Sequence, residues 1–129
     1  IRAFPVTDVT GKTLKGAIRD NVAPSARMVT DEYGSYRGLD KEFAGGHDTV
    51  SHKWGEYARG DVFTNTAEAF FALLKRGVIG TFHNVSRKHL HRYVTEFEFR
   101  WNTRKMNDGK RIAALVRSGE GKRLMYRNP

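Results

Sequence analysis

The hydrophobic pattern in the second half of the chain predicts an amphipathic helix. In "TNTAEAFFALLKRG" the apolar residues fall at i, i+3, i+4 and i+7, the spacing of one helical face, and they are Ala67, Phe70, Phe71 and Leu74. Thr64 or Asn65 can cap its start, and Gly77 stands where a C-terminal glycine belongs. We expect Phe70, Phe71 and Leu74 to anchor this helix to the core.

A longer helix is predicted after Ser86, which can act as its N-cap. The apolar stripe of "RKHLHRYVTEFEFRWNTRK" comprises Leu90, Tyr93, Val94, Phe97 and Trp101. The tail "GKRIAALVRSGEGKRLMYRNP" predicts one further short helix and a basic end.

Shorter patterns in the first half predict strands and helices in alternation. "RAFPVTD" alternates loosely and favours a strand, "KTLKGAIRDNV" favours a short helix, and "ARMVT" favours a second strand. "DEYGSYRGL" looks helical despite Gly34, and residues 41–61 form a glycine-rich loop with one strand near "DTVSH". This order indicates an α/β layered structure, and we expect residues 1–129 to form a single domain.

The composition narrows the class of protein. The chain has no cysteine, which excludes disulfides and thiolate zinc sites. No apolar run reaches the ~18 residues of a membrane span, so we expect no membrane partner. The start "IRAFPVTDVT" lacks the pattern of a signal peptide, and we expect a cytoplasmic protein.

Positive charge is concentrated in the C-terminal third. The chain has 23 Lys and Arg against 14 Asp and Glu, a net charge of +9. Residues 1–85 hold 11 basic and 10 acidic side chains, whereas residues 86–129 hold 12 basic and 4 acidic ones. This asymmetry favours a polyanionic partner such as nucleic acid. A solvated basic surface or an acidic protein partner is the alternative.

Polar residues line the other face of the first predicted helix. Asn65, Glu68, Ala72 and Lys75 share this face, and Ala72 leaves space one turn after the carboxylate. A carboxylate can carry a divalent ion here and Lys75 can hold a phosphate, an arrangement that suits phosphoryl transfer. Alternatively, Asn65 and Glu68 form a capping box at the helix start.

A second acidic position lies where the strand "ARMVT" ends. Asp31 follows this strand directly, and sites in open α/β sheets gather at the carboxyl ends of strands. The alternative is again capping, with Thr30 as the N-cap and Asp31 and Glu32 as first-turn acids.

Two stretches carry a resemblance to a known family, "TDEYGSYRGL" and "GEYARGDVFTNTAEAFFALLKRGVIGTFHNVSRKHLHRYVTEFEFRWN". They resemble the bacterial insertion-sequence transposases of the DDE type, over most of residues 1–105. The resemblance implies a ribonuclease-H-like sheet flanked by helices. It also implies two divalent ions, Mg²⁺ or Mn²⁺, and DNA cleavage and strand transfer at transposon ends and target DNA. A homo-oligomer associated with the nucleoid is the expected assembly.

The resemblance also assigns roles to single residues. Asp31 matches the second catalytic aspartate, Glu68 the third acid, and Lys75 the basic residue that follows it, while Asn65 is an alternative metal ligand. A set of further side chains is expected to contact DNA together with Lys75: Arg76, His83, Arg87, Lys88, Arg92 and Arg104. The alternative for His83 is a structural role. Trp54 either stacks on a base or packs in the protein.

The first catalytic aspartate of the family has no counterpart in this sequence. Asp8 follows the strand after the one expected to carry that acid, and "DVTGK" favours a turn. We therefore expect a C-terminal fragment of a catalytic core that lacks its first strands and is inactive alone. The alternatives are a non-catalytic DNA-binding remnant and an oligomerisation module whose acids only cap helices.

Overall fold

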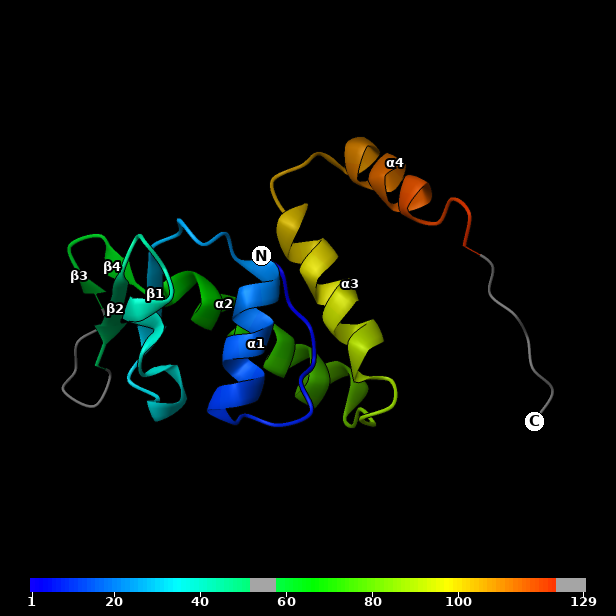
Figure 1. Cartoon of the computed structure of the whole chain (residues 1–129). Coiled ribbons are helices and arrows are strands. Elements are labelled where there is room, and N and C mark those ends of the chain that lie inside the picture. The colour runs from blue at the N-terminus through cyan, green and yellow to red at the C-terminus, as the bar shows by residue number, and fades with distance from the viewer. Residues whose placement is uncertain (52–57, 123–129) are drawn as a thin grey trace.

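The computed structural model describes residues 1–51 and 58–122, and the described part of the chain is mixed α/β (Figure 1). Trp54 and the last residues of the basic tail lie outside these described residues. The described α-helices are α1 (Gly11–Asn21), α2 (Asn65–Gly77), α3 (Leu90–Asn102) and α4 (Asp108–Ser118). The strands are β1 (Met28–Asp31), β2 (His47–Val50), β3 (Ala58–Arg59) and β4 (Val62–Phe63).

The strands form two small sheets. β1 pairs with β2 in parallel, with Met28 opposite His47 and Asp31 opposite Val50, and β3 pairs with β4 antiparallel. The strands expected at "ARMVT" and near "DTVSH" are thereby confirmed. Val50 is fully buried beside other core residues of this half: Leu39, Phe43 and Val62. The core of this half therefore lies where β2 meets the connection from β1.

The connection from β1 to β2 departs from the single helix expected over residues 31–39. It contains two short 3-10 helices, Gly34–Tyr36 and Leu39–Lys41, separated by a turn. Gly38 adopts a φ of 88° in this turn, a left-handed conformation that other residues rarely take. This turn interrupts the helical spacing and prevents one continuous helix.

The N-terminal segment corrects another prediction, because residues 1–10 form no strand. This segment lies along α3 (Figure 1), where Asn102 bonds both to the amino group and to the carbonyl oxygen of Ile1, each at 2.7 Å. The Ala3 N–H donates to Glu98 at 3.0 Å. Side chains of α3 therefore take backbone groups that a sheet neighbour would otherwise pair, and Pro5 offers no N–H.

The helix α1 follows this segment and confirms the expected short helix. The Thr10 hydroxyl caps its start by accepting from the Thr13 N–H at 3.4 Å. Asp8 accepts from the Thr10 N–H and hydroxyl at 3.0 and 2.7 Å, which agrees with its expected place in a turn. These hydrogen bonds lower the pKa of Asp8 to about 2, with the Thr10 hydroxyl as the largest cause.

The helix α2 confirms the expected helix over residues 65–77, but the chain does not leave the helical conformation at Gly77. The chain continues into a π-helical turn over Val78–Phe82, and Gly77 has ordinary helical angles, φ −63° and ψ −47°. A β-carbon at Gly77 would overlap the ring of Phe97 on α3. The glycine is therefore required for close helix packing rather than for a C-terminal turn.

Aromatic side chains join α2 to α3. Phe70 is 1% exposed and meets the ring of Trp101 edge-on at a centroid distance of 6.0 Å. The Phe82 ring contacts the rings of Tyr93 and Phe97 at centroid distances of 4.7 and 6.5 Å. The expected core stripe of α3 is confirmed by the buried Val94 and Phe97. These pairs fix the crossing of the two helices.

Two helix starts differ from or refine the expectations. The helix α3 begins at Leu90 rather than at Arg87, because a hydrogen-bonded turn links the His89 N–H to the Ser86 carbonyl oxygen. The helix α4 confirms the short helix expected in the tail, and the Asn107 side chain caps it by accepting from the Lys110 N–H.

Within residues 1–51 and 58–122, each helix is too short or too polar to cross a membrane.

Candidate functional site

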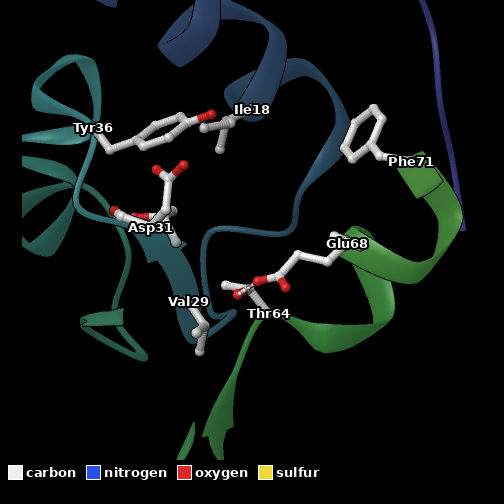
Figure 2. Close-up of a pocket in the computed structure, with 9 residues that line it drawn as sticks. Ile18, Val29, Asp31, Tyr36, Thr64, Glu68 and Phe71 are labelled. Carbon is white, nitrogen blue, oxygen red and sulfur yellow. Dashed lines mark hydrogen bonds between the residues drawn. The ribbon is translucent and has the colours of Figure 1, made fainter. Parts of the chain in front are cut away.

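A pocket of about 380 Å³ lies between β1, α1 and the start of α2 (Figure 2). Its lining combines polar and apolar side chains from segments that are distant in the sequence: Ile18, Val29, Thr30, Asp31, Tyr36, Thr64, Ala67, Glu68 and Phe71. Asp31 and Glu68, the two carboxylates singled out in the sequence, thus line the same pocket. The parallel pairing of β1 and the packing of α2 bring them to it.

Asp31 is the last residue of β1, and its carboxylate is exposed in the pocket. The Tyr33 N–H donates to one carboxylate oxygen at 3.1 Å, which fixes the turn after the strand. The buried Thr30 hydroxyl donates to the Asp31 carbonyl oxygen and contacts His47 Nε2, both at 2.8 Å. Thr30 therefore holds the strand end and does not cap a helix.

Glu68 lies in the first turn of α2. Thr64 is the N-cap residue, but its side chain makes no capping hydrogen bond to the helix backbone. Its hydroxyl instead donates to Glu68 Oε1 at 2.5 Å (Figure 2). Glu68 is thereby held toward its own helix start while it still lines the pocket.

Tyr36 covers the Asp31 side of the pocket, and Figure 2 shows its ring above the Asp31 carboxylate. Burial raises the pKa of Tyr36, and the negative charge of Asp31 raises it further. The neighbouring Tyr33 ring meets it edge-on at 6.1 Å. The phenol is therefore held as a neutral hydrogen-bond donor beside the carboxylate.

The donor set of the pocket fits a magnesium ion. Both carboxylates line the same pocket, although that of Asp31 points toward Tyr36 and that of Glu68 toward Thr64 (Figure 2). Magnesium is commonly held by one or two carboxylates together with water and substrate phosphate. Among the described residues, no group of three or more His, Cys, Asp or Glu side chains could hold a metal ion. A metal ion bound here would therefore take its remaining ligands from water or substrate.

The other residues predicted for the site lie around it rather than in it. Asn65 is exposed at the first position of α2 and is not among the residues that line the pocket. Lys75 and Arg76 are exposed in the last turns of the same helix. The Glu68 and Lys75 spacing along α2 is as expected, with the cation two turns beyond the carboxylate.

The remaining residues predicted to bind DNA are distributed between α2 and the end of α3. Arg87 and Lys88 are exposed in the turn before α3, and Arg92 is exposed on the helix itself. Arg104 lies over the Trp101 ring at 4.3 Å and donates to the Trp101 carbonyl oxygen. The Arg104 guanidinium therefore already interacts with Trp101, which weakens its availability for a DNA phosphate.

His83 occupies a tight turn. It has φ 59° and ψ −35°, and the Asn84 N–H donates to the Phe82 carbonyl oxygen at 2.6 Å. This is the geometry of a three-residue γ-turn, which is rare for residues other than glycine. The side chain is exposed in the segment between α2 and α3.

The sequence analysis missed the two aromatic residues that line the pocket. Phe71 was expected in the core, but it is 53% exposed and lines the pocket. Its position three residues after Glu68 was the available signal, because residues at i and i+3 share a helix face. Tyr36 had no such signal, because the 3-10 turn that directs it at Asp31 was expected to be part of a regular helix.

Comparison with known proteins places the chain in a family. An uncharacterized protein in transposable element ISH50 of Halobacterium salinarum is 30% identical over 97 residues, which are 75% of this chain and 33% of that protein. The chain thus spans about a third of the length of this relative. No solved structure matches the chain significantly. The family model of the ISXO2-like transposase domain matches residues 1–102. Because this match covers most of the chain, the chain belongs to the ISXO2-like transposase domain family.

Proposed function

We propose that this chain carries two carboxylates of a DDE-type site that cleaves and joins DNA in the intact transposase. The observation that carries the proposal is that Asp31 and Glu68 line one pocket although they lie on separate elements. Membership of a transposase family supports a role in transposition and implies DNA as a partner. Neither carboxylate is needed to complete the hydrophobic core.

Magnesium fits this pocket as the metal. Bound there, it would polarise a phosphodiester and stabilise charge on the attacking and leaving oxygens. Asp31 would present its carboxylate from a fixed strand end, and Glu68 would turn from Thr64 toward the shared space. Tyr36, kept protonated, would donate a hydrogen bond to substrate oxygen beside Asp31.

We further propose a ribonuclease-H-like core for the intact protein. A parallel strand pair with an acid at the strand end, followed by a helix bearing the next acid, supports this assignment. The pocket offers two carboxylates from the described residues, and a DDE site uses three. We therefore propose that the 129 residues alone hold metal weakly and do not cleave DNA. A homo-oligomer would be the active form.

The basic residues of α2 and α3 would bind the DNA backbone. Lys75 lies on the same helix face as Glu68 and would contact a phosphate beside the cut. Arg87 and Lys88 precede α3 as exposed cations without an ion pair in the described part of the chain. Such contacts position DNA without reading its sequence.

The second candidate function is a DNA-binding module without catalysis. The hydrogen bond from Thr64 to Glu68 favours it, because this carboxylate then serves the start of α2. The basic surface would remain, and binding would depend steeply on salt but not on magnesium. Metal binding by Glu68 separates the two functions.

The test is a titration of the chain with Mn²⁺, with free Mn²⁺ measured by electron paramagnetic resonance. We expect saturable binding that Asp31→Asn and Glu68→Gln each weaken about tenfold or more. Asp40→Asn removes an exposed carboxylate outside the pocket and should change nothing. The amide oxygen introduced by Glu68→Gln can still accept from the Thr64 hydroxyl, so the circular dichroism of this variant should match the wild type.

Two results would contradict the proposal. One is an unchanged affinity in Glu68→Gln, which would return this carboxylate to a structural role at the helix start. The other is the absence of saturable Mn²⁺ binding in the wild type, which would leave the DNA-binding module as the function.

A further inference from the structure

Phe71 is an exposed aromatic residue in an unusual place. Single exposed apolar side chains are normal on protein surfaces and need no explanation. Phe71, however, lines the same pocket as Glu68 from one turn further along α2 (Figure 2), and it is 53% exposed. The buried Phe70 meets its ring edge-on at 5.7 Å, which helps to orient it. The buried Phe70 thus holds the Phe71 ring in position at the pocket.

Charged residues lie before and after Phe71 on the same face of α2. Glu68, Phe71 and Lys75 stand at i, i+3 and i+7, so they follow one another along a single exposed face. About 10 Å of helix axis separates residue 68 from residue 75, and residue 71 lies between them along the helix. This face of α2 therefore carries three groups in order: a carboxylate able to bind a metal, then a flat apolar ring, then a cation.

This order matches one nucleotide of a DNA strand. A metal-bound phosphate, a flat base and the next phosphate would face Glu68, Phe71 and Lys75 respectively. In a duplex both faces of a base are covered by its neighbours, so a protein ring can reach a base face only where the base is unstacked. Aromatic rings combined with cations are the usual means of binding unpaired strands.

We propose that Phe71 stacks on an unpaired base and that the pocket therefore prefers DNA with an unpaired nucleotide at the reacting phosphate. This inference rests on the proposed function, because it names the substrate form taken by the same site. Phe71 would be a specificity-determining residue that touches the DNA. Lys75 would hold the adjoining phosphate.

The test compares two DNA probes in buffer containing a metal chelator. One is a blunt duplex, and the other carries a single-stranded overhang with 2-aminopurine, an adenine analogue whose fluorescence falls on stacking. We expect the wild-type chain to bind the overhang probe about tenfold more tightly than the blunt duplex and to quench its emission. Phe71→Leu should lose both effects and keep the blunt-duplex affinity, while Phe71→Trp should retain them.

Ile79 supplies the matched control. It is 71% exposed on the π-helical turn that continues α2, and it does not line the pocket. Ile79→Ala removes comparable exposed apolar surface and should preserve the overhang preference. Because Phe71 is exposed, Phe71→Leu should fold as the wild type does, which circular dichroism checks.

The outcomes separate this inference from the proposed function. Equal affinity of the wild type for both probes, or quenching that persists in Phe71→Leu, would overturn the role of Phe71 even if Mn²⁺ binding holds. An overhang preference that depends on Phe71 would support it even if Mn²⁺ binding fails. The chain would then be a binder of unpaired DNA without the metal chemistry.

Discussion

Replacing Gly77 with alanine tests the close crossing of α2 and α3. A β-carbon at this position would lie 2.9 Å from both Cε atoms of Phe97 and closer still to Cζ. Carbon atoms in contact normally lie about 3.5–4.0 Å apart, so the ring must retreat by roughly 1.5 Å. Phe97 is only 6% exposed, and the Phe82 ring packs edge-on against it at a centroid distance of 6.5 Å. These contacts leave little room for that movement.

The expected effect is a net loss of stability. Alanine is favoured over glycine inside a helix by about 1 kcal/mol, and the helical angles of Gly77 suit it. Overpacking a filled core costs roughly 1–3 kcal/mol, and the buried, enclosed ring places this site at the upper end. Gly77→Ala should therefore lower the free energy of unfolding by about 2 kcal/mol.

Urea denaturation followed by far-UV circular dichroism measures this change. Gly16→Ala is the matched control, because Gly16 lies inside α1 with no atom within 4 Å of a β-carbon. It should raise stability by about 0.5–1 kcal/mol. Adding Phe97→Leu to Gly77→Ala should recover part of the loss, seen as coupling in a double-mutant cycle. A neutral or stabilising Gly77→Ala would refute the close helix crossing.

Two further predictions concern acid stability and DNA binding. Asp8 has a pKa lowered from 3.8 to about 2, so its stabilisation is present above about pH 4 and lost as the pH falls through about 2. Asp8→Asn should thus be less stable than the wild type at neutral pH and approach it below about pH 2 in urea denaturation. Equal stability at neutral pH would contradict this reasoning. Arg87→Gln with Lys88→Gln should reduce the slope of log K against log salt by about 2 for duplex DNA, measured by fluorescence anisotropy. Lys12→Gln on α1 should leave that slope unchanged, and a double variant with an unchanged slope would exclude these phosphate contacts.

The periodic segments could be predicted from the sequence, and the irregular ones could not. The apolar spacing in α2 and α3 reflects burial against a neighbouring helix, and Phe70, Val94 and Phe97 are buried as it implied. The N-terminal segment had only a loose alternation, and its backbone groups are bonded to Asn102 and Glu98. Those partners lie far along the chain, so local pattern gave no signal for them.

The candidate site was also only partly readable from sequence. Asp31 and Glu68 were selected by their positions at a strand end and on a polar helix face, together with the family resemblance. Their common pocket depends on how α2 packs beside β1, which spacing does not encode. Gly77 shows the same limit, because its position suggested a helix end while its role depends on the ring of Phe97.

The two faces of α2 link the stability of the fold to the proposed site. Phe70 and Gly77 hold one face against α3, and this fixes the rotation of the helix about its axis. The opposite face then presents Glu68 and Phe71 to the pocket that contains Asp31. Gly77 lies about 13 Å along the axis from Glu68, so forcing the helices apart at Gly77 would tilt the carboxylate relative to β1. A side chain at position 77 should therefore weaken Mn²⁺ binding as well as folding, although it touches no metal ligand.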